Sequence, residues 1–335
     1  MTHRRLLVTA IALALVAGAC GAPAGSSDSH SPSAGPGSSP SGGTGCAATP
    51  EPASDIVSAW SGTQSPSVYP QIIDPGGTIV CGQNRLMFSF LDAANVPIAS
   101  PDRTVTVALY DLGKDPALAA VSATAEFIWA IPDQVGVYVA NVDIPTSGLW
   151  GAEFTTAVAD AAPETIRVPF DVRSTRTVVS VGDPAPASDT PTLADVGGDV
   201  AKLSTDDEPV TAFYETSVAE ALTANEPFVL IFATPKFCAS AQCGPTLDRV
   251  KPIAATHPGV TFINVEPYQL QDVDGQLQPI LTGDPPALTP APATDEWRLP
   301  SEPWVFVVDR EGIVRSSLML IFGDEELEAA IAAVE

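Results

Sequence analysis

The stretch PFVLIFATPKFCASAQCGP, residues 227–245, decides the fold of the C-terminal part of this chain. Its first seven residues are all apolar, which is typical of a strand that is buried on both faces of a sheet. Cys238 and Cys243 follow that strand directly, with four residues between them. The pair Gly244-Pro245 favours a helix start, with Gly244 as the N-cap and Pro245 as the first helical residue.

The spacing of the two cysteines argues against a helix that contains both. On an α-helix, positions i and i+5 lie about 140° apart and rise about 7.5 Å, whereas a disulfide needs Cα atoms within about 7 Å. We therefore expect Cys238 in a loop and Cys243 just before the helix. A helix N-terminus stabilises a thiolate, so at least one sulfur should be unusually reactive. Either cysteine could be the nucleophile.

The sequence around this stretch alternates between helix and strand patterns. Such alternation implies a mainly parallel or mixed α/β sheet. The expected elements are helices over 217–225 and from 245 to about 256, a strand over 260–265, a hairpin of strands over 303–309 and 313–321, and a final helix capped by Asp324.

This order of elements, with a cysteine pair after the first buried strand, resembles the thioredoxin-like (redoxin/TlpA-like) domains over about residues 206–335. Pro303 opens a strand where that family carries a cis-proline facing its active cysteines. The turn Asp309-Arg310-Glu311-Gly312 is similar to that of exported thioredoxin-like reductases. The resemblance implies a thiol–disulfide oxidoreductase with Cys238, Cys243 and Pro303 at its site, acting on protein thiols and disulfides of the cell envelope.

The chain departs from the family in its Cys-x4-Cys spacing, because thioredoxins space the pair as Cys-x-x-Cys. A second alignment matches Cys243-Gly244-Pro245-Thr246 to Cys-Gly-Pro-Cys, with Thr246 in place of the second cysteine. The non-enzymatic alternative is an envelope binding or scaffold lipoprotein in which the pair is a structural disulfide.

Two further alternatives are a thiol peroxidase and a copper-delivery protein. Peroxiredoxins carry Thr three residues before the reactive Cys, whereas Thr234 lies four before Cys238, and Pro303 occupies the place of their peroxide-orienting Arg. Copper-delivery proteins of this fold add a distal His. His257 is the only His in this part of the chain and lies elsewhere, so we expect it to be a solvated loop residue.

The N-terminus has the pattern of an export signal. Arg4 and Arg5 precede an apolar run over 6–19, which is too short to span a bilayer because that takes about 20 residues. The run ends in Val-Ala-Gly-Ala-Cys, which resembles the lipobox of bacterial lipoproteins. The resemblance implies a signal peptide over 1–20, a lipid on Cys20, and a protein anchored to the outer face of the bacterial cell membrane. Residues 21–52 are mostly Gly, Ser, Ala, Pro and Thr, so we expect a disordered tether.

Four cysteines remain once Cys20 is set aside. Even numbers suggest disulfides in an oxidising compartment. Proximity pairs Cys238 with Cys243, which leaves Cys46 to staple the end of the tether to Cys81.

Residues 53–175 contain short segments of alternating polarity separated by turn residues, which predicts an immunoglobulin-like β-sandwich. We interpret it as a spacer or partner-docking domain, because residues 53–205 hold no His that could bind copper. Residues 176–205 are rich in Ser, Thr, Asp, Gly and Pro and are expected to be a linker before the thioredoxin-like domain, 206–335.

The charge balance narrows the range of partners. The chain has 15 Lys and Arg against 40 Asp and Glu, a net charge of −25. A nucleic-acid binder needs a basic face for phosphates, so we expect no nucleic-acid partner. We expect no cofactor and no metal.

Overall fold

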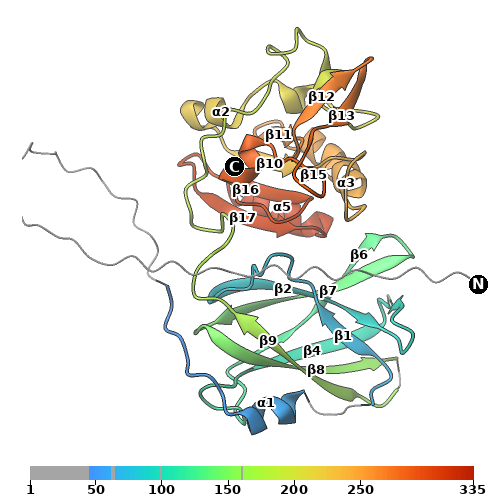
Figure 1. Ribbon diagram of the computed structural model, residues 1–335, viewed down its shortest axis with the longest axis vertical. Helices are drawn as coiled ribbons and strands as arrows, with labels where there is room; N and C mark the ends of the chain where they lie inside the picture. Colours follow the sequence, from blue (N-terminus) through green and yellow to red (C-terminus); the bar gives the residue numbers. More distant parts are fainter. Residues whose placement is uncertain (1–44, 62–64, 99, 160) are drawn as a thin grey trace, which may run out of the picture. The chain divides into compact units, whose positions relative to one another are not determined.

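The computed structural model describes residues 45–61, 65–98, 100–159 and 161–335 (Figure 1). The described residues belong to one compact unit. Within it we distinguish a β-sandwich part, residues 45–175, and a mixed-sheet part, residues 176–335. The predicted signal peptide, Cys20 and most of the predicted tether lie outside the described residues.

The β-sandwich part consists of two antiparallel sheets (Figure 1). One has the order β1-β2-β7-β6 with β3 beside β2, and the other has the order β5-β4-β8-β9. The elements are α1 (Ser54–Trp60), β1 (Tyr69–Ile72), β2 (Gly82–Leu91), β3 (Pro97–Ile98), β4 (Arg103–Asp111), β5 (Val121–Thr124), β6 (Glu126–Ile131), β7 (Val135–Ile144), β8 (Gly148–Val158) and β9 (Glu164–Val172).

Alternation of side chains builds the core between these sheets. In β4, Val105, Val107 and Leu109 are buried, and the residues between them are more exposed. Aromatic rings join the two sheets: Phe88 of β2 and Phe154 of β8 meet edge to face, with centroids 4.8 Å apart. These contacts account for the sandwich that the alternating pattern predicts.

Residues 45–52 belong to this part, although the sequence assigned them to the tether. Cys46 forms a disulfide with Cys81, with Cα atoms 6.3 Å apart, which is the pairing that the cysteine count predicts. Ala48 forms a bridge with Ser147, and the Thr49 N–H donates to the Ser147 carbonyl. The disulfide and these backbone contacts therefore hold the chain against the sandwich before residue 53.

The mixed-sheet part is built on a four-stranded sheet in the order β11-β10-β16-β17. β10 and β11 are parallel, whereas β10 with β16 and β16 with β17 are antiparallel. The elements are the 3₁₀ turns η1 (Val200–Lys202) and η2 (Thr211–Tyr214), α2 (Val218–Ala224), β10 (Phe228–Phe232), α3 (Cys243–Thr256), β11 (Thr261–Val265), β12 (Leu270–Val273), β13 (Gln276–Pro279), β14 (Leu281–Thr282), β15 (Ala287–Leu288), α4 (Pro292–Glu296), β16 (Trp304–Val308), β17 (Val314–Met319) and α5 (Asp324–Ala332).

The sheet is covered on both faces. All five residues of β10 and all five of β16 are buried. On one face, Val229 and Ile231 pack in a cluster with side chains of α3 and α5, and on the other, Phe228, Leu230 and Phe232 pack in a cluster with side chains of α2. This is why β10 is apolar at every position.

Part of the segment 176–205 packs against the mixed sheet, whereas the sequence indicated a linker. The Gly182 N–H donates to the Val314 carbonyl, and the Val314 N–H donates to the Asp183 carbonyl, so this segment pairs with the outer edge of β17. Val178 and Val179 are buried. Pairing with the sheet edge gives backbone N–H and C=O groups of this segment hydrogen-bond partners, which its loop-like composition does not predict.

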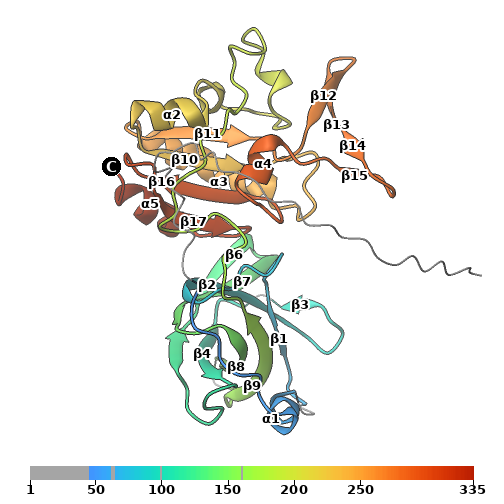
Figure 2. The ribbon, with the colours of Figure 1, turned by 60° about the vertical axis from the view of Figure 1, so that its left-hand side comes forward.

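Two hairpins, β12–β13 and β14–β15, follow β11 and precede β16 in the sequence, and they extend away from the sheet (Figure 2). The sequence indicated only a Pro-rich excursion over 279–300. After the hairpins, Trp297 and Trp304 are 0% and 3% exposed, so both belong to the core. None of the helices in the described residues is long and apolar enough to cross a bilayer.

Candidate functional site

The end of β10 and the start of α3 position the two cysteines. β10 ends at Phe232. The loop after it contains Cys238 and leads to Cys243, the first residue of α3. The two sulfurs form a disulfide, with Cα atoms 6.0 Å apart. Cys238 lies outside the helix, as the spacing predicts.

The helix begins earlier than the sequence indicated. We expected Gly244 as the N-cap, but α3 starts at Cys243 and its N-cap is Gln242. Pro245 lies within the first turn, where backbone N–H groups have no carbonyl partner inside the helix, so its missing N–H costs nothing. The shift puts Cys243 at the end of the helix that favours negative charge.

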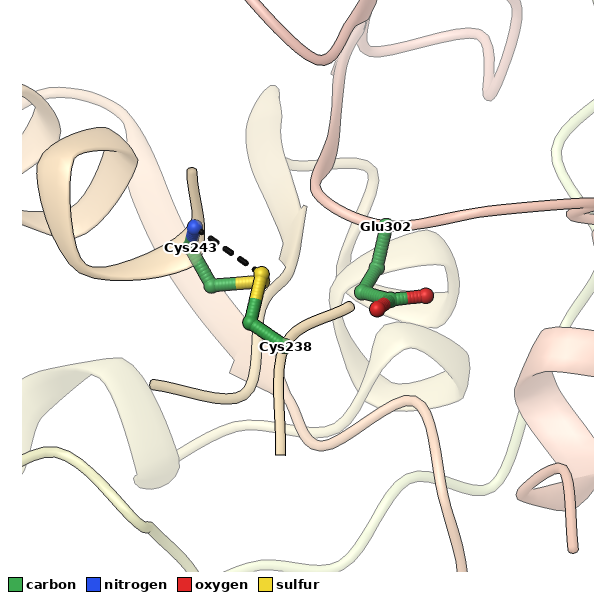
Figure 3. Close-up of side chains that lie close together, drawn as sticks. All are labelled: Cys238, Cys243 and Glu302. Atoms are coloured by element: carbon green, nitrogen blue, oxygen red, sulfur yellow. Dashed lines mark hydrogen bonds between the residues drawn. A yellow bond between two sulfur atoms is a disulfide. The ribbon is translucent and has the colours of Figure 1, made fainter. Parts of the chain in front are cut away.

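The two cysteines differ in exposure. Cys243 is 0% exposed and packs in the hydrophobic cluster between α3 and the sheet, whereas Cys238 is partly exposed. The Cys243 backbone N–H donates to the Cys238 sulfur at 3.2 Å (Figure 3). The Ser240 hydroxyl lies 3.4 Å from the same sulfur. If the disulfide opens, the Cys243 N–H can stabilise a thiolate on Cys238.

Pro303 follows a cis peptide bond from Glu302 and immediately precedes β16. The Ser240 hydroxyl donates to the Glu302 carbonyl at 2.9 Å, which brings the residue before Pro303 against the cysteine loop. The structure therefore collects Cys238, Cys243 and the Glu302–Pro303 pair in one place.

Glu302 is a site residue that the sequence analysis missed. Glu302 is 4% exposed, and its carboxylate accepts the Ala239 N–H at 2.8 Å and the Tyr268 hydroxyl at 2.6 Å. Burial, together with this hydrogen bond to the Glu302 carboxylate, raises the pKa of Tyr268. The donors sit sixty-three and thirty-four residues from Glu302 in the sequence, so only its place before Pro303 could have drawn attention to it.

A second buried carboxylate lies at the end of β11. Glu266 is 8% exposed, and the Thr205 N–H donates to its Oε1 atom at 2.6 Å. Its Oε2 atom has no hydrogen-bond partner within the described chain. Burial raises the pKa of Glu266 to about 7, although the hydrogen bond from the Thr205 N–H acts in the opposite direction.

The remaining predicted positions lie elsewhere. Cys46 and Cys81 form their disulfide in the β-sandwich part, and Cys20 lies outside the described residues. His257 is the C-cap residue of α3, and its Nδ1 atom lies 2.9 Å from a carboxylate oxygen of Glu335, so this half-buried side chain has a partner.

Comparisons with known proteins give little guidance. No family model matches the chain, and no curated protein matches it. A solved structure of a DUF4426 family protein from Pseudomonas aeruginosa PAO1 is 12% identical, with 34% of this chain and 97% of that chain covered, at a TM-score of 0.24. At this TM-score the similarity does not bear on fold or function.

Proposed function

We propose that this chain is a lipid-anchored, extracytoplasmic thiol–disulfide oxidoreductase with a thioredoxin-like domain over residues 206–335. One observation carries the proposal: a disulfide joins the partly exposed loop residue Cys238 to the buried Cys243 at the first position of a helix, and Glu302, the residue before Pro303, contacts this loop. That pair offers one sulfur to a partner and keeps the other inside the protein.

The arrangement of elements supports the thioredoxin-like assignment. β10, α3 and β11 form a parallel strand–helix–strand unit, and β16 and β17 form an antiparallel hairpin that leads into α5. The immunoglobulin-like β-sandwich would then serve as a spacer or a partner-docking module between the membrane and this domain.

Exposure and hydrogen bonding favour Cys238 as the nucleophile. Its thiolate attacks one sulfur of a partner disulfide, a mixed disulfide forms, and the partner's other sulfur leaves as a thiolate that takes up a proton. The Cys243 thiolate then attacks the Cys238 sulfur and expels the second partner thiolate. The partner gains two electrons and two protons, the Cys238–Cys243 bond re-forms, and the reverse sequence oxidises a partner dithiol.

The reduction potential of the pair separates this function from a structural disulfide in a binding or scaffold protein. We expect a value above about −300 mV, because structural disulfides of secreted proteins lie below it. The Cys46→Ser/Cys81→Ser variant isolates the pair for this titration. A value well below about −300 mV means that the bond is structural and that the proposed function is wrong.

Trapping tests the order of attack. With a model disulfide substrate, Cys243→Ser should accumulate a mixed disulfide on Cys238, because no second sulfur is available to release the partner. Cys238→Ser is the matched control and should trap much less, since Cys243 is fully buried. Equal trapping by both variants would contradict the assignment of Cys238.

The lipid anchor rests on the residues before Cys20, and mass spectrometry of the mature N-terminus tests it. We expect a chain that starts at Cys20 with a lipid on its sulfur. A mature chain that starts beyond Cys20 without lipid removes the anchor from the proposal and leaves the dithiol chemistry unaffected.

A further inference from the structure

Three potential metal-ligand atoms converge at the cysteine loop. The ligand atoms of Cys238, Cys243 and Glu302 all lie within 4.8 Å of one another. They come from three segments: the loop after β10, the first residue of α3, and the residue before Pro303 (Figure 3). Two of the three residues are buried.

We propose that the reduced form of this cluster binds one zinc ion through the Cys238 and Cys243 thiolates and the Glu302 carboxylate. This is a site of two sulfurs and one oxygen, which leaves one tetrahedral position for water. Thiolate and carboxylate are both established zinc ligands. The site requires only that the disulfide can be reduced, and it does not depend on exchange with a partner protein.

The geometry needs only small movements. A tetrahedral Zn²⁺ with bonds of about 2.3 Å to sulfur and about 2.1 Å to oxygen places its ligand atoms roughly 3.6–3.8 Å apart. Breaking the disulfide moves the two sulfurs apart toward that separation. The carboxylate already lies within 4.8 Å of both sulfurs, so it has to approach by no more than about 1.2 Å.

The negative charge of the reduced cluster favours the binding of a cation. Glu302 is buried, and no ion pair within the described residues includes its carboxylate. A buried carboxylate without a cation is costly, and two thiolates beside it would add like charge. A divalent cation would neutralise most of the three negative charges.

Two hydrogen bonds prepare the carboxylate for this role. The Ala239 N–H and the Tyr268 hydroxyl each donate to one oxygen of Glu302. A carboxylate has about four lone-pair sites, so both donors leave room for a metal bond. Partners of this kind orient metal ligands, and their loss typically lowers metal affinity 10- to 100-fold.

Zinc binding releases protons from the two thiols and transfers no electrons. The two thiols lose two protons as two Zn–S bonds form, and neither the sulfurs nor the metal changes oxidation state. The disulfide and the zinc complex are mutually exclusive, because each uses both sulfurs. Zinc would therefore protect the reduced pair from oxidation and from mixed-disulfide formation.

The test is a titration of the full chain with Zn²⁺ and, as a spectroscopic probe, Co²⁺, after reduction by a dithiol that is then removed without air. We expect one ion per reduced chain, a thiolate-to-cobalt charge-transfer band, and release of about two protons per zinc at a pH where both thiols are protonated. The oxidised protein should bind none at this cluster. Absence of binding to the reduced protein overturns the proposal.

Variants identify the oxygen ligand. Glu302→Gln should weaken zinc binding more than tenfold, and Tyr268→Phe, which keeps the carboxylate, by about tenfold. Glu266→Gln changes another buried carboxylate outside the cluster and should leave the affinity unchanged. An unchanged affinity in folded Glu302→Gln overturns the carboxylate's role as a ligand. If that variant does not fold, an unchanged affinity in Tyr268→Phe contradicts binding by a carboxylate that Tyr268 orients.

The two proposals fail separately. Disulfide exchange is measured in the presence of a chelator, and zinc binding is measured without a partner. Exchange without zinc binding overturns only the metal site. Zinc binding by a pair whose reduction potential is structural overturns only the oxidoreductase.

Discussion

At the scale of single residues, Glu266 ties the stability of the fold to pH. Its pKa in the folded protein is about 7, above the ordinary value of 4.5. The folded protein therefore holds a proton that the unfolded chain releases. The stability that this group contributes is complete below about pH 4.5 and is lost as the pH rises through about 7.

Glu266→Gln removes this pH dependence, because an amide stays neutral. Between about pH 4.5 and about pH 8, we expect the free energy of unfolding of the variant to gain up to about 3 kcal/mol relative to the unchanged protein. Urea denaturation at both pH values measures it. The exposed Glu328→Gln is the control. If the difference in the free energy of unfolding between the variant and the unchanged protein is the same at both pH values, the raised pKa of Glu266 is contradicted.

The residues of the candidate site differ in how well the sequence predicts them. Cys238 and Cys243 are visible because cysteines are rare in this chain and follow an apolar strand. Glu302 is one of forty acidic residues, and its donors come from the cysteine loop and from the segment after β11. Long-range contacts give this carboxylate its place, and no local pattern records them.

At the scale of elements, the sequence predicts regular segments well and short or atypical ones poorly. The alternation over 104–110 and 149–155 falls within β4 and β8, and the apolar run over 227–233 contains β10. β5 and β6 are harder to predict, because β5 has only four residues and β6 is apolar at five of its six positions instead of alternating. Residues 176–205 have a loop-like composition, yet edge pairing with β17 holds part of them in place.

The Cys46–Cys81 disulfide links an irregular segment to the start of β2, across thirty-five residues. Closing a loop of this length in the unfolded chain corresponds to about 4 kcal/mol on the chain-entropy model. We expect the double variant Cys46→Ser/Cys81→Ser to lose about 2–4 kcal/mol of stability, measured by denaturant unfolding.

The control for this variant is Cys238→Ser/Cys243→Ser. That pair closes a ring of only a few residues, so its loss should cost less on the same model. An equal or larger loss in the control would mean that chain entropy does not decide the effect of the Cys46–Cys81 bond.

At the scale of the whole molecule, charge is the dominant feature. Even if each of the 15 cations neutralised one acid, 25 of the 40 acidic residues would remain without a cation. Like charges repel most strongly in the compact state, so a net charge of −25 works against folding. The same charge favours partners and ions that carry positive charge.

Salt should therefore stabilise this protein. The Debye length falls from about 30 Å at 0.01 M salt to about 10 Å at 0.1 M, which screens repulsion between charges on separate elements. We expect the melting temperature to rise by a few degrees over this range of sodium chloride and to change little beyond it, because the remaining repulsion is short-range. Sodium and potassium chloride should act alike if screening is the cause. A melting temperature that stays constant or falls between 0.01 and 0.1 M would mean that local ion pairs, such as Lys251–Asp206 at 2.7 Å, outweigh the excess of negative charge.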